Sequence, residues 1–136
     1  MSPLELIQSA YASYDRGDFA AVFALLSPDI EIVQTDLLPW GGTHHGHEGA
    51  RTFFSLLGQH TEAMPKPEVF VPAGNEVAVY GRLRGTARAS GKPIDLAIVH
   101  LWTVENDLIT RFAAYIDTPA MLEALSPISA ISGEGR

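Results

Sequence analysis

The chain has 136 residues and a mass of 14.7 kDa, which suffices for one domain with a single hydrophobic core. Hydrophobic residues make up 46% of it and charged residues 18%, a balance that excludes an intrinsically disordered chain. Asp and Glu number 16 against 9 Lys and Arg, and the resulting net charge of −7 argues against a nucleic-acid partner.

The composition also excludes several kinds of chemistry and location. The chain has no cysteine, so it can form no disulfide, thiol nucleophile or cysteine-bound zinc site. No apolar run approaches the roughly 18 residues that a transmembrane helix needs. The first residues lack the basic and continuously apolar segments of an export signal. We therefore expect a cytoplasmic protein without a membrane partner.

Helical patterns dominate the first half of the chain. Ser2, Pro3 and Glu5 have the spacing of a capping box, and Gly17 ends the helix that they begin. Asp18 is placed to cap a second, shorter helix. The elements expected in this half are those two helices, the second over 19–26, a strand over 30–34, a loop over 36–42 and a helix over 47–59.

After Pro67 the hydrophobic period changes to two, which is typical of strands. Ser90-Gly91 and Asn106-Asp107 are turn signals, so the last three strands are expected to form antiparallel hairpins. The pattern predicts an α+β domain over 1–125, with helices on one face of a curved antiparallel sheet, and a tail over 126–136. The expected elements are strands over 69–73, 77–87, 94–104 and 108–117, and a helix over 118–125.

Five segments, taken in order, resemble a known superfamily. Their sequence and spacing are similar to the SnoaL-like branch of the nuclear-transport-factor-2-like superfamily, over roughly residues 4 to 125. The resemblance implies a cystatin-like fold in which N-terminal helices wrap the curved sheet into a cone around an apolar pocket. The segments are YASYDRGD (11–18), SPDIE (27–31), GGTHHGHEG (41–49), HLWTV (100–104) and FAAYID (112–117).

The resemblance implies a wide choice of activities, because the superfamily contains ketosteroid isomerases, polyketide cyclases, epoxide hydrolases, dehydratases and non-catalytic binding domains. When the catalytic positions of these enzymes are aligned with this sequence, residues of other types stand in place of their acids and bases. The isomerase tyrosine and its two aspartates fall on Ala10, Gln34 and His100. The epoxide hydrolase set falls on Gly81, Leu83, Ala114, Ile32 and Gln34, and the cyclase acid falls near Ala114.

Strand parity shows which side chains share the inner face of the sheet. Two of them, His100 and Gln34, are polar exceptions in an apolar wall. They are our catalytic candidates, with His100 as acid or base and Gln34 polarising the substrate or a water; the alternative is that both are core residues with satisfied hydrogen bonds. The residues expected to bind the ligand are Tyr14, Ile32, Trp40, Phe54, Leu83, Ile98, Trp102, Phe112 and Ala114.

Two further features allow more than one interpretation. His44, His45, His47 and Glu48 form a cluster of metal-ligand types, but their spacing matches no helical zinc motif, so we expect no metal and no other cofactor. Trp40 lies beside a proline and two glycines, where it can cover a pocket or pack in the core.

These observations predict a protein that binds a small apolar or amphipathic organic molecule. It is either a cofactor-independent isomerase, cyclase or hydrolase with an unusual acid–base set, or a non-catalytic binding or dimerisation domain. Parity also predicts an apolar stripe on the outer face of the sheet, which we expect a second copy of the chain to cover in a homodimer. The stripe consists of Tyr80, Arg82, Val99, Leu101, Ala113 and Tyr115.

Overall fold

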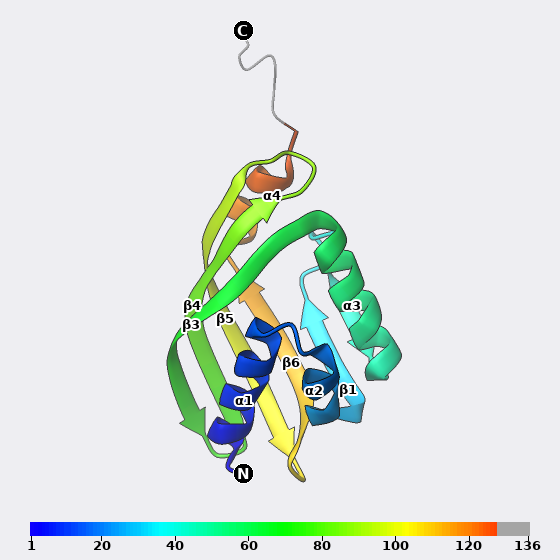
Figure 1. Cartoon of the computed structure of the whole chain (residues 1–136), viewed down its shortest axis with the longest axis vertical. Coiled ribbons are helices and arrows are strands. Elements are labelled where there is room, and N and C mark those ends of the chain that lie inside the picture. Colours follow the sequence, from blue (N-terminus) through cyan, green and yellow to red (C-terminus); the bar gives the residue numbers. More distant parts are fainter. Residues whose placement is uncertain (128–136) are drawn as a thin grey trace, which may run out of the picture.

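A computed structural model describes residues 1–127 of the chain. It confirms the α+β class: helices lie over one face of a curved, six-stranded sheet (Figure 1). The predicted tail, 126–136, lies outside the described residues from position 128 onward. The elements are α1 (Pro3–Asp15), α2 (Phe19–Leu25), β1 (Leu26–Gln34), β2 (Gly42–His45), α3 (Gly46–His60), β3 (Thr61–Ala73), β4 (Glu76–Ala87), β5 (Pro93–Glu105), β6 (Leu108–Ile116) and α4 (Thr118–Leu125).

The predicted helix starts are confirmed. Ser2 accepts a hydrogen bond from the backbone N–H of Glu5, and the Glu5 carboxylate accepts one from the backbone N–H of Ser2, so both halves of the capping box are present. Asp18 caps α2 in the same manner through the N–H of Ala21. No helix among residues 1–127 is both long and apolar enough to cross a membrane.

The sheet has the order β2-β1-β6-β5-β4-β3. The two predicted hairpins, β4–β5 and β5–β6, are antiparallel, and Asn106 and Asp107 both have positive φ (52° and 61°), as a tight type I′ turn requires. β1 differs from the rest because it runs parallel to β6. This pairing places β1 between β2 and β6, so that the inner faces of β1 and β6 lie side by side.

Three strands were missed or predicted too short. β1 was predicted over 30–34 but begins at Leu26, and no strand was predicted where β2 pairs with β1. β3 was predicted to begin at Val69 but begins at Thr61. Pro65 and Pro67 misled the prediction because proline usually interrupts a strand. β3 is at the edge of the sheet, where proline is tolerated, and a register shift follows Pro67. Here the backbones approach so closely that a Cβ on Gly81 would lie 2.2 Å from the Lys66 carbonyl oxygen.

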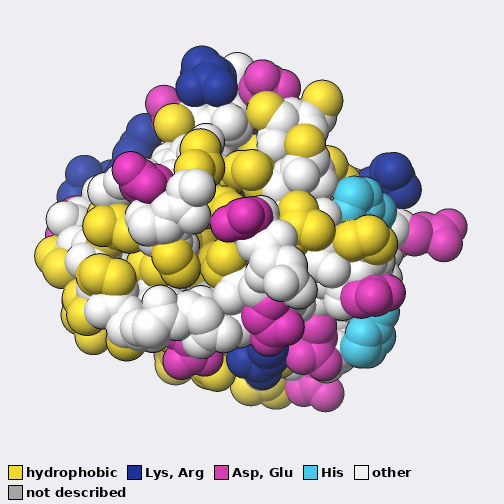
Figure 2. Space-filling view, turned by 90° about the horizontal axis from the view of Figure 1, so that it is seen from below, with side chains coloured by type: hydrophobic (Ala, Val, Ile, Leu, Met, Phe, Trp, Pro, Cys, Tyr) yellow, Lys and Arg dark blue, Asp and Glu magenta, His cyan; other side chains and the backbone are white. Residues whose placement is uncertain are grey.

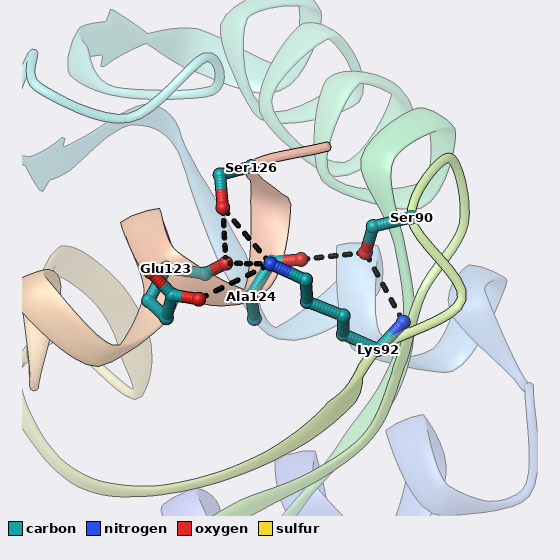
Figure 3. Close-up of polar contacts among 5 residues, drawn as sticks. All are labelled: Ser90, Lys92, Glu123, Ala124 and Ser126. Atoms are coloured by element: carbon teal, nitrogen blue, oxygen red, sulfur yellow. Dashed lines mark hydrogen bonds and ion pairs between the residues drawn. The ribbon is translucent and has the colours of Figure 1, made fainter. Parts of the chain in front are cut away.

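The C-terminal end of α4 is tethered to the turn between β4 and β5 (Figure 3). The Lys92 ammonium donates to the Glu123 carbonyl at 3.1 Å, to its carboxylate at 3.1 Å and to the Ser126 hydroxyl at 3.0 Å. Ser90 donates its hydroxyl proton to the carbonyl of Ala124 at 2.6 Å. A cation beside the last carbonyls of a helix also favours the helix dipole. The tether therefore holds α4 against the sheet.

Replacing Lys92 by methionine should lower the free energy of unfolding by about 1 kcal/mol, because it removes these bonds while keeping the aliphatic stem. The matched control is Lys66→Met, whose partner Asp15 is 4.0 Å away and well exposed. That control should cost less than about 0.5 kcal/mol. Urea denaturation at equal protein concentration measures both variants. Equal losses for the two would show that the tether contributes nothing.

The outer face of the sheet carries exposed apolar side chains. Tyr80, Val99 and Tyr115 are cross-strand neighbours with exposures of 48%, 37% and 57%. Ala113 was predicted to extend the stripe, but it is fully buried, because its cross-strand neighbours are the larger Leu101 and Val33. Val69 and Val71 extend the apolar surface across β3 instead, and Figure 2 shows hydrophobic side chains gathered on the side that carries β3 and β4.

We propose that a second copy of the chain covers this face, since monomers rarely expose a contiguous apolar patch of this kind. Light scattering at micromolar concentration should give about 29 kDa, twice the chain mass of 14.7 kDa. Tyr115→Lys should reduce that mass to one chain, whereas Leu37→Lys, at a loop position that is 66% exposed, should not. A wild-type protein of single-chain mass would disprove the dimer.

Candidate functional site

A cavity lies inside the cone, between α1, α3 and the inner face of the sheet. The space inside it, counted together with the open solvent at its mouth, is about 780 Å³. Its wall contains ten of the eleven predicted site residues; the eleventh, Ile32, is buried in the core beside it. The ten are Tyr14, Gln34, Trp40, Phe54, Leu83, Ile98, His100, Trp102, Phe112 and Ala114.

The resemblance aligns several catalytic positions of the superfamily with residues of this chain, and most of those residues line this cavity. Ala10, Gln34, Leu83, His100 and Ala114 all line it. They come from α1, β1, β4, β5 and β6, so only the tertiary structure brings them together. Among the described residues, no Asp or Glu lines the cavity. The carboxylates on which the known isomerases, hydrolases and cyclases depend are therefore replaced here by amide, imidazole and methyl groups.

His100 is held by a hydrogen-bond chain that begins on α1. The Tyr11 hydroxyl lies 2.5 Å from Nδ1 of His100, and the Trp102 indole N–H donates to the same hydroxyl oxygen at 3.1 Å. Tyr11 was not among the predicted site residues. It follows Ile7 by four positions, on the face of α1 that packs on the core, which is the one signal that places it inside.

The surroundings of His100 keep its imidazole neutral. The Phe112 ring meets it edge-on at 4.9 Å between centroids, and Tyr11 stacks beside it at 6.0 Å. Burial in this aromatic cage lowers the pKa of His100 to about 4. Burial likewise raises the pKa of the Tyr11 and Tyr14 hydroxyls. Near pH 7, therefore, none of the cavity-lining side chains among residues 1–127 is charged.

Gln34 is held by Trp40. The Trp40 indole N–H donates to Oε1 of Gln34 at 2.7 Å, and both side chains are buried. The sequence left open whether Trp40 covers a pocket or packs in the core. The structure combines the two, because Trp40 is only 1% exposed and yet contributes to the cavity wall.

The histidines of β2 and the first turn of α3 lie outside the cavity wall. His44 and His47 bond through Nε2 to the backbone carbonyls of Trp40 and Leu26, each at 3.0 Å, so both rings support the loop and the start of α3. His45 points away from them on β2 and is exposed. Among residues 1–127, no three His, Asp or Glu side chains gather as a metal site would require.

The family follows from comparison with known proteins. Residues 7–112 match the model of the SnoaL-like domain family. The chain belongs to the SnoaL-like family. An NTF2-like protein from Burkholderia thailandensis E264 is 31% identical, with a TM-score of 0.87, over 93% of this chain and 99% of that one.

Two other solved structures are similar to this SnoaL-like chain. TerC, co-crystallised with polyporic acid, is 27% identical, with a TM-score of 0.82, over 90% of this chain and 97% of its own. A candidate polyketide cyclase from Pseudomonas putida KT2440 is 20% identical, with a TM-score of 0.81, over 93% and 99% of the two chains, which is a likeness of fold alone. No curated protein matched the sequence.

The neutral imidazole of His100 has a consequence for stability. Its folded pKa is about 4, whereas the unfolded value is about 6.5. Between these values the unfolded chain binds a proton that the folded chain does not, so the free energy of unfolding falls as the pH decreases. We expect His100 to account for a loss of up to about 3 kcal/mol between pH 7 and pH 4, and for no change above pH 7.

The measurement is chemical denaturation from pH 4 to pH 8 for the wild type and His100→Leu. Other groups titrate in both proteins, so the difference between the two curves isolates the imidazole. Parallel curves would show that His100 becomes protonated as easily in the folded state as in the unfolded state.

Proposed function

We propose that this SnoaL-like domain binds a small, largely apolar organic molecule inside the cone, with His100 and Gln34 as its polar anchors. The observation that carries the proposal is the placement of these two side chains. They are 9% and 6% exposed, both line one cavity, and every other lining residue is apolar or aromatic except the hydroxyl residue Thr61. A pocket with few convergent polar groups in an apolar wall is typical of a small-molecule site.

The comparisons support the same class of ligand. TerC, which covers nearly the same fold at 27% identity, was crystallised with an organic acid. The likeness to a candidate polyketide cyclase points to oxygen-bearing, carbon-rich compounds as well, though at the level of fold. We therefore favour lipophilic carbonyl compounds over sugars or nucleotides, whose many polar groups would lack partners in this wall.

A second function, cofactor-independent catalysis on such a ligand, is favoured by one observation. A neutral imidazole with a hydroxyl at hydrogen-bond distance, as in His100 and Tyr11, can exchange a proton with a reacting group. The absence of carboxylates among the described lining residues weighs toward binding as the primary function. An isomerase, cyclase or hydrolase activity would depend on His100.

The test is a thermal-shift screen of lipophilic carbonyl compounds, followed by titration of the hits. His100→Leu should weaken their binding by about 1–3 kcal/mol, or roughly 5- to 150-fold, the worth of one buried hydrogen bond. His45→Leu, an exposed histidine outside the cavity, is the matched control and should bind as the wild type does.

Two results would contradict the proposal. If no lipophilic compound stabilises the wild type, the cavity is not a ligand site. If hits bind His100→Leu as tightly as the wild type, His100 is a structural residue and the assigned anchor is wrong.

A further inference from the structure

The hydrogen bonds around the two anchors determine which of their atoms remain free for a ligand. In the His100 chain, the Trp102 indole can only donate, so the Tyr11 oxygen accepts from it. The Tyr11 hydroxyl proton then has one acceptor within reach in the described residues, Nδ1 of His100. A neutral imidazole that accepts at Nδ1 carries its proton on Nε2. His100 therefore offers the cavity an N–H donor.

Gln34 is oriented by the same logic. The Trp40 indole N–H is a donor without acceptor capacity, so the Gln34 atom that it meets at 2.7 Å is the amide oxygen. The amide NH₂ group is left, and it has no protein partner among residues 1–127. Gln34 is more than nine-tenths buried and lines the cavity. It also offers hydrogen-bond donors, and leaving them unsatisfied costs free energy.

The two donors lie in one row across the sheet. His100 on β5 pairs with Ala114 on β6. Val33 on β1 pairs with Ala113 on the parallel strand β6, so the next residues, Gln34 and Ala114, lie side by side as well. Two strand spacings, about 10 Å, separate the backbones that carry the donors. Between them Ala114 contributes a single methyl group. The small side chain of Ala114 therefore leaves space between the two donors, where a ligand ring could lie.

The remaining polar groups of the cavity wall do not change the excess of hydrogen-bond donors over acceptors. The Thr61 hydroxyl donates its proton to the carbonyl of Leu57 at 3.0 Å. The Tyr14 hydroxyl can donate as well as accept. No carboxylate, free amide oxygen or unprotonated imidazole nitrogen faces the cavity from the described residues. A ligand hydroxyl would thus find few acceptors, whereas a ligand carbonyl would find donors on two sides.

We propose that the cavity selects a carbonyl compound with two acceptor oxygens over a ligand with donor groups, and that Tyr11 and Trp40 are the positioning residues that make it do so. The inference rests on the proposed function and adds the ligand class to it. Tyr11 holds His100 as a donor through its hydroxyl, and Trp40 does the same for the amide of Gln34. Both act through another side chain and are not catalytic residues.

The first test measures the protein without any ligand. Long-range ¹H–¹⁵N NMR of the full chain at pH 7 distinguishes the two neutral tautomers of a histidine. We expect His100 to carry its proton on Nε2. Tyr11→Phe should shift the tautomer equilibrium of His100, while Tyr80→Phe, an exposed tyrosine on the outer face, should leave it unchanged. A proton on Nδ1 in the wild type would overturn the proposal.

The second test compares three bicyclic probes of similar shape by calorimetric titration without oxygen. They are 1,4-naphthoquinone, whose two oxygens only accept; 1,4-dihydroxynaphthalene, whose two hydroxyls each donate a proton as well as accept; and naphthalene, which does neither. The chain has no cysteine to react with the quinone. We expect the quinone to bind at least tenfold more tightly than either of the others. In Trp40→Phe, where the Gln34 amide can turn, the preference for the quinone over the diol should decrease several-fold.

The outcomes separate this inference from the function on which it rests. Equal affinities for quinone, diol and naphthalene would leave the apolar binding site standing and overturn the donor selectivity. Tighter binding of the diol would also overturn it. Failure of all three probes to bind would contradict the proposed function itself, while the tautomer of His100 would still decide whether the donor arrangement exists.

Discussion

The arrangement of the site depends on one constraint: a polar group buried in an apolar cavity must find a hydrogen-bond partner. His100 and Gln34 are buried on the inner face of a sheet whose other side chains there are almost all apolar. One polar atom of each is hydrogen-bonded to an aromatic residue from a different element, Tyr11 on α1 and Trp40 in the loop between β1 and β2. These bonds reduce the cost of burial and also orient the anchors.

This constraint links stability to function. Tyr11 ties α1 to β5 through His100 and Trp102, so the helix that covers the cone is also bonded to its most polar inner residue. Trp40 brings the loop after β1 into the core instead of leaving it over the mouth. Ala10 and Ala114 each contribute only a methyl group to the wall between these bonds, which leaves room for the cavity.

Much of the fold is predictable from local patterns. Ser2 and Glu5, Asp18, and the Asn106-Asp107 turn each determine their structure through contacts within a few residues, so they are visible in the sequence. β2 and the first half of β3 were harder, although each pairs with a neighbouring strand in the chain, because neither shows a clear alternation of apolar and polar residues. Pro65 and Pro67 forbid a central strand but not an edge strand, and the sequence does not state which strand is at the edge.

The sequence by itself determined the class of fold, the inner faces of the strands and the identity of His100 and Gln34 as polar exceptions in an apolar wall. These follow from period-two alternation, a property of neighbouring residues. Tertiary structure alone decided the partners, because Tyr11 is 89 residues from His100 and Trp102 is 91 residues from Tyr11. Which nitrogen of His100 carries the proton depends on what lies within hydrogen-bond distance of it in space. Strand parity can direct a side chain inward, but only packing of a distant helix against the sheet can supply the hydroxyl that it meets there.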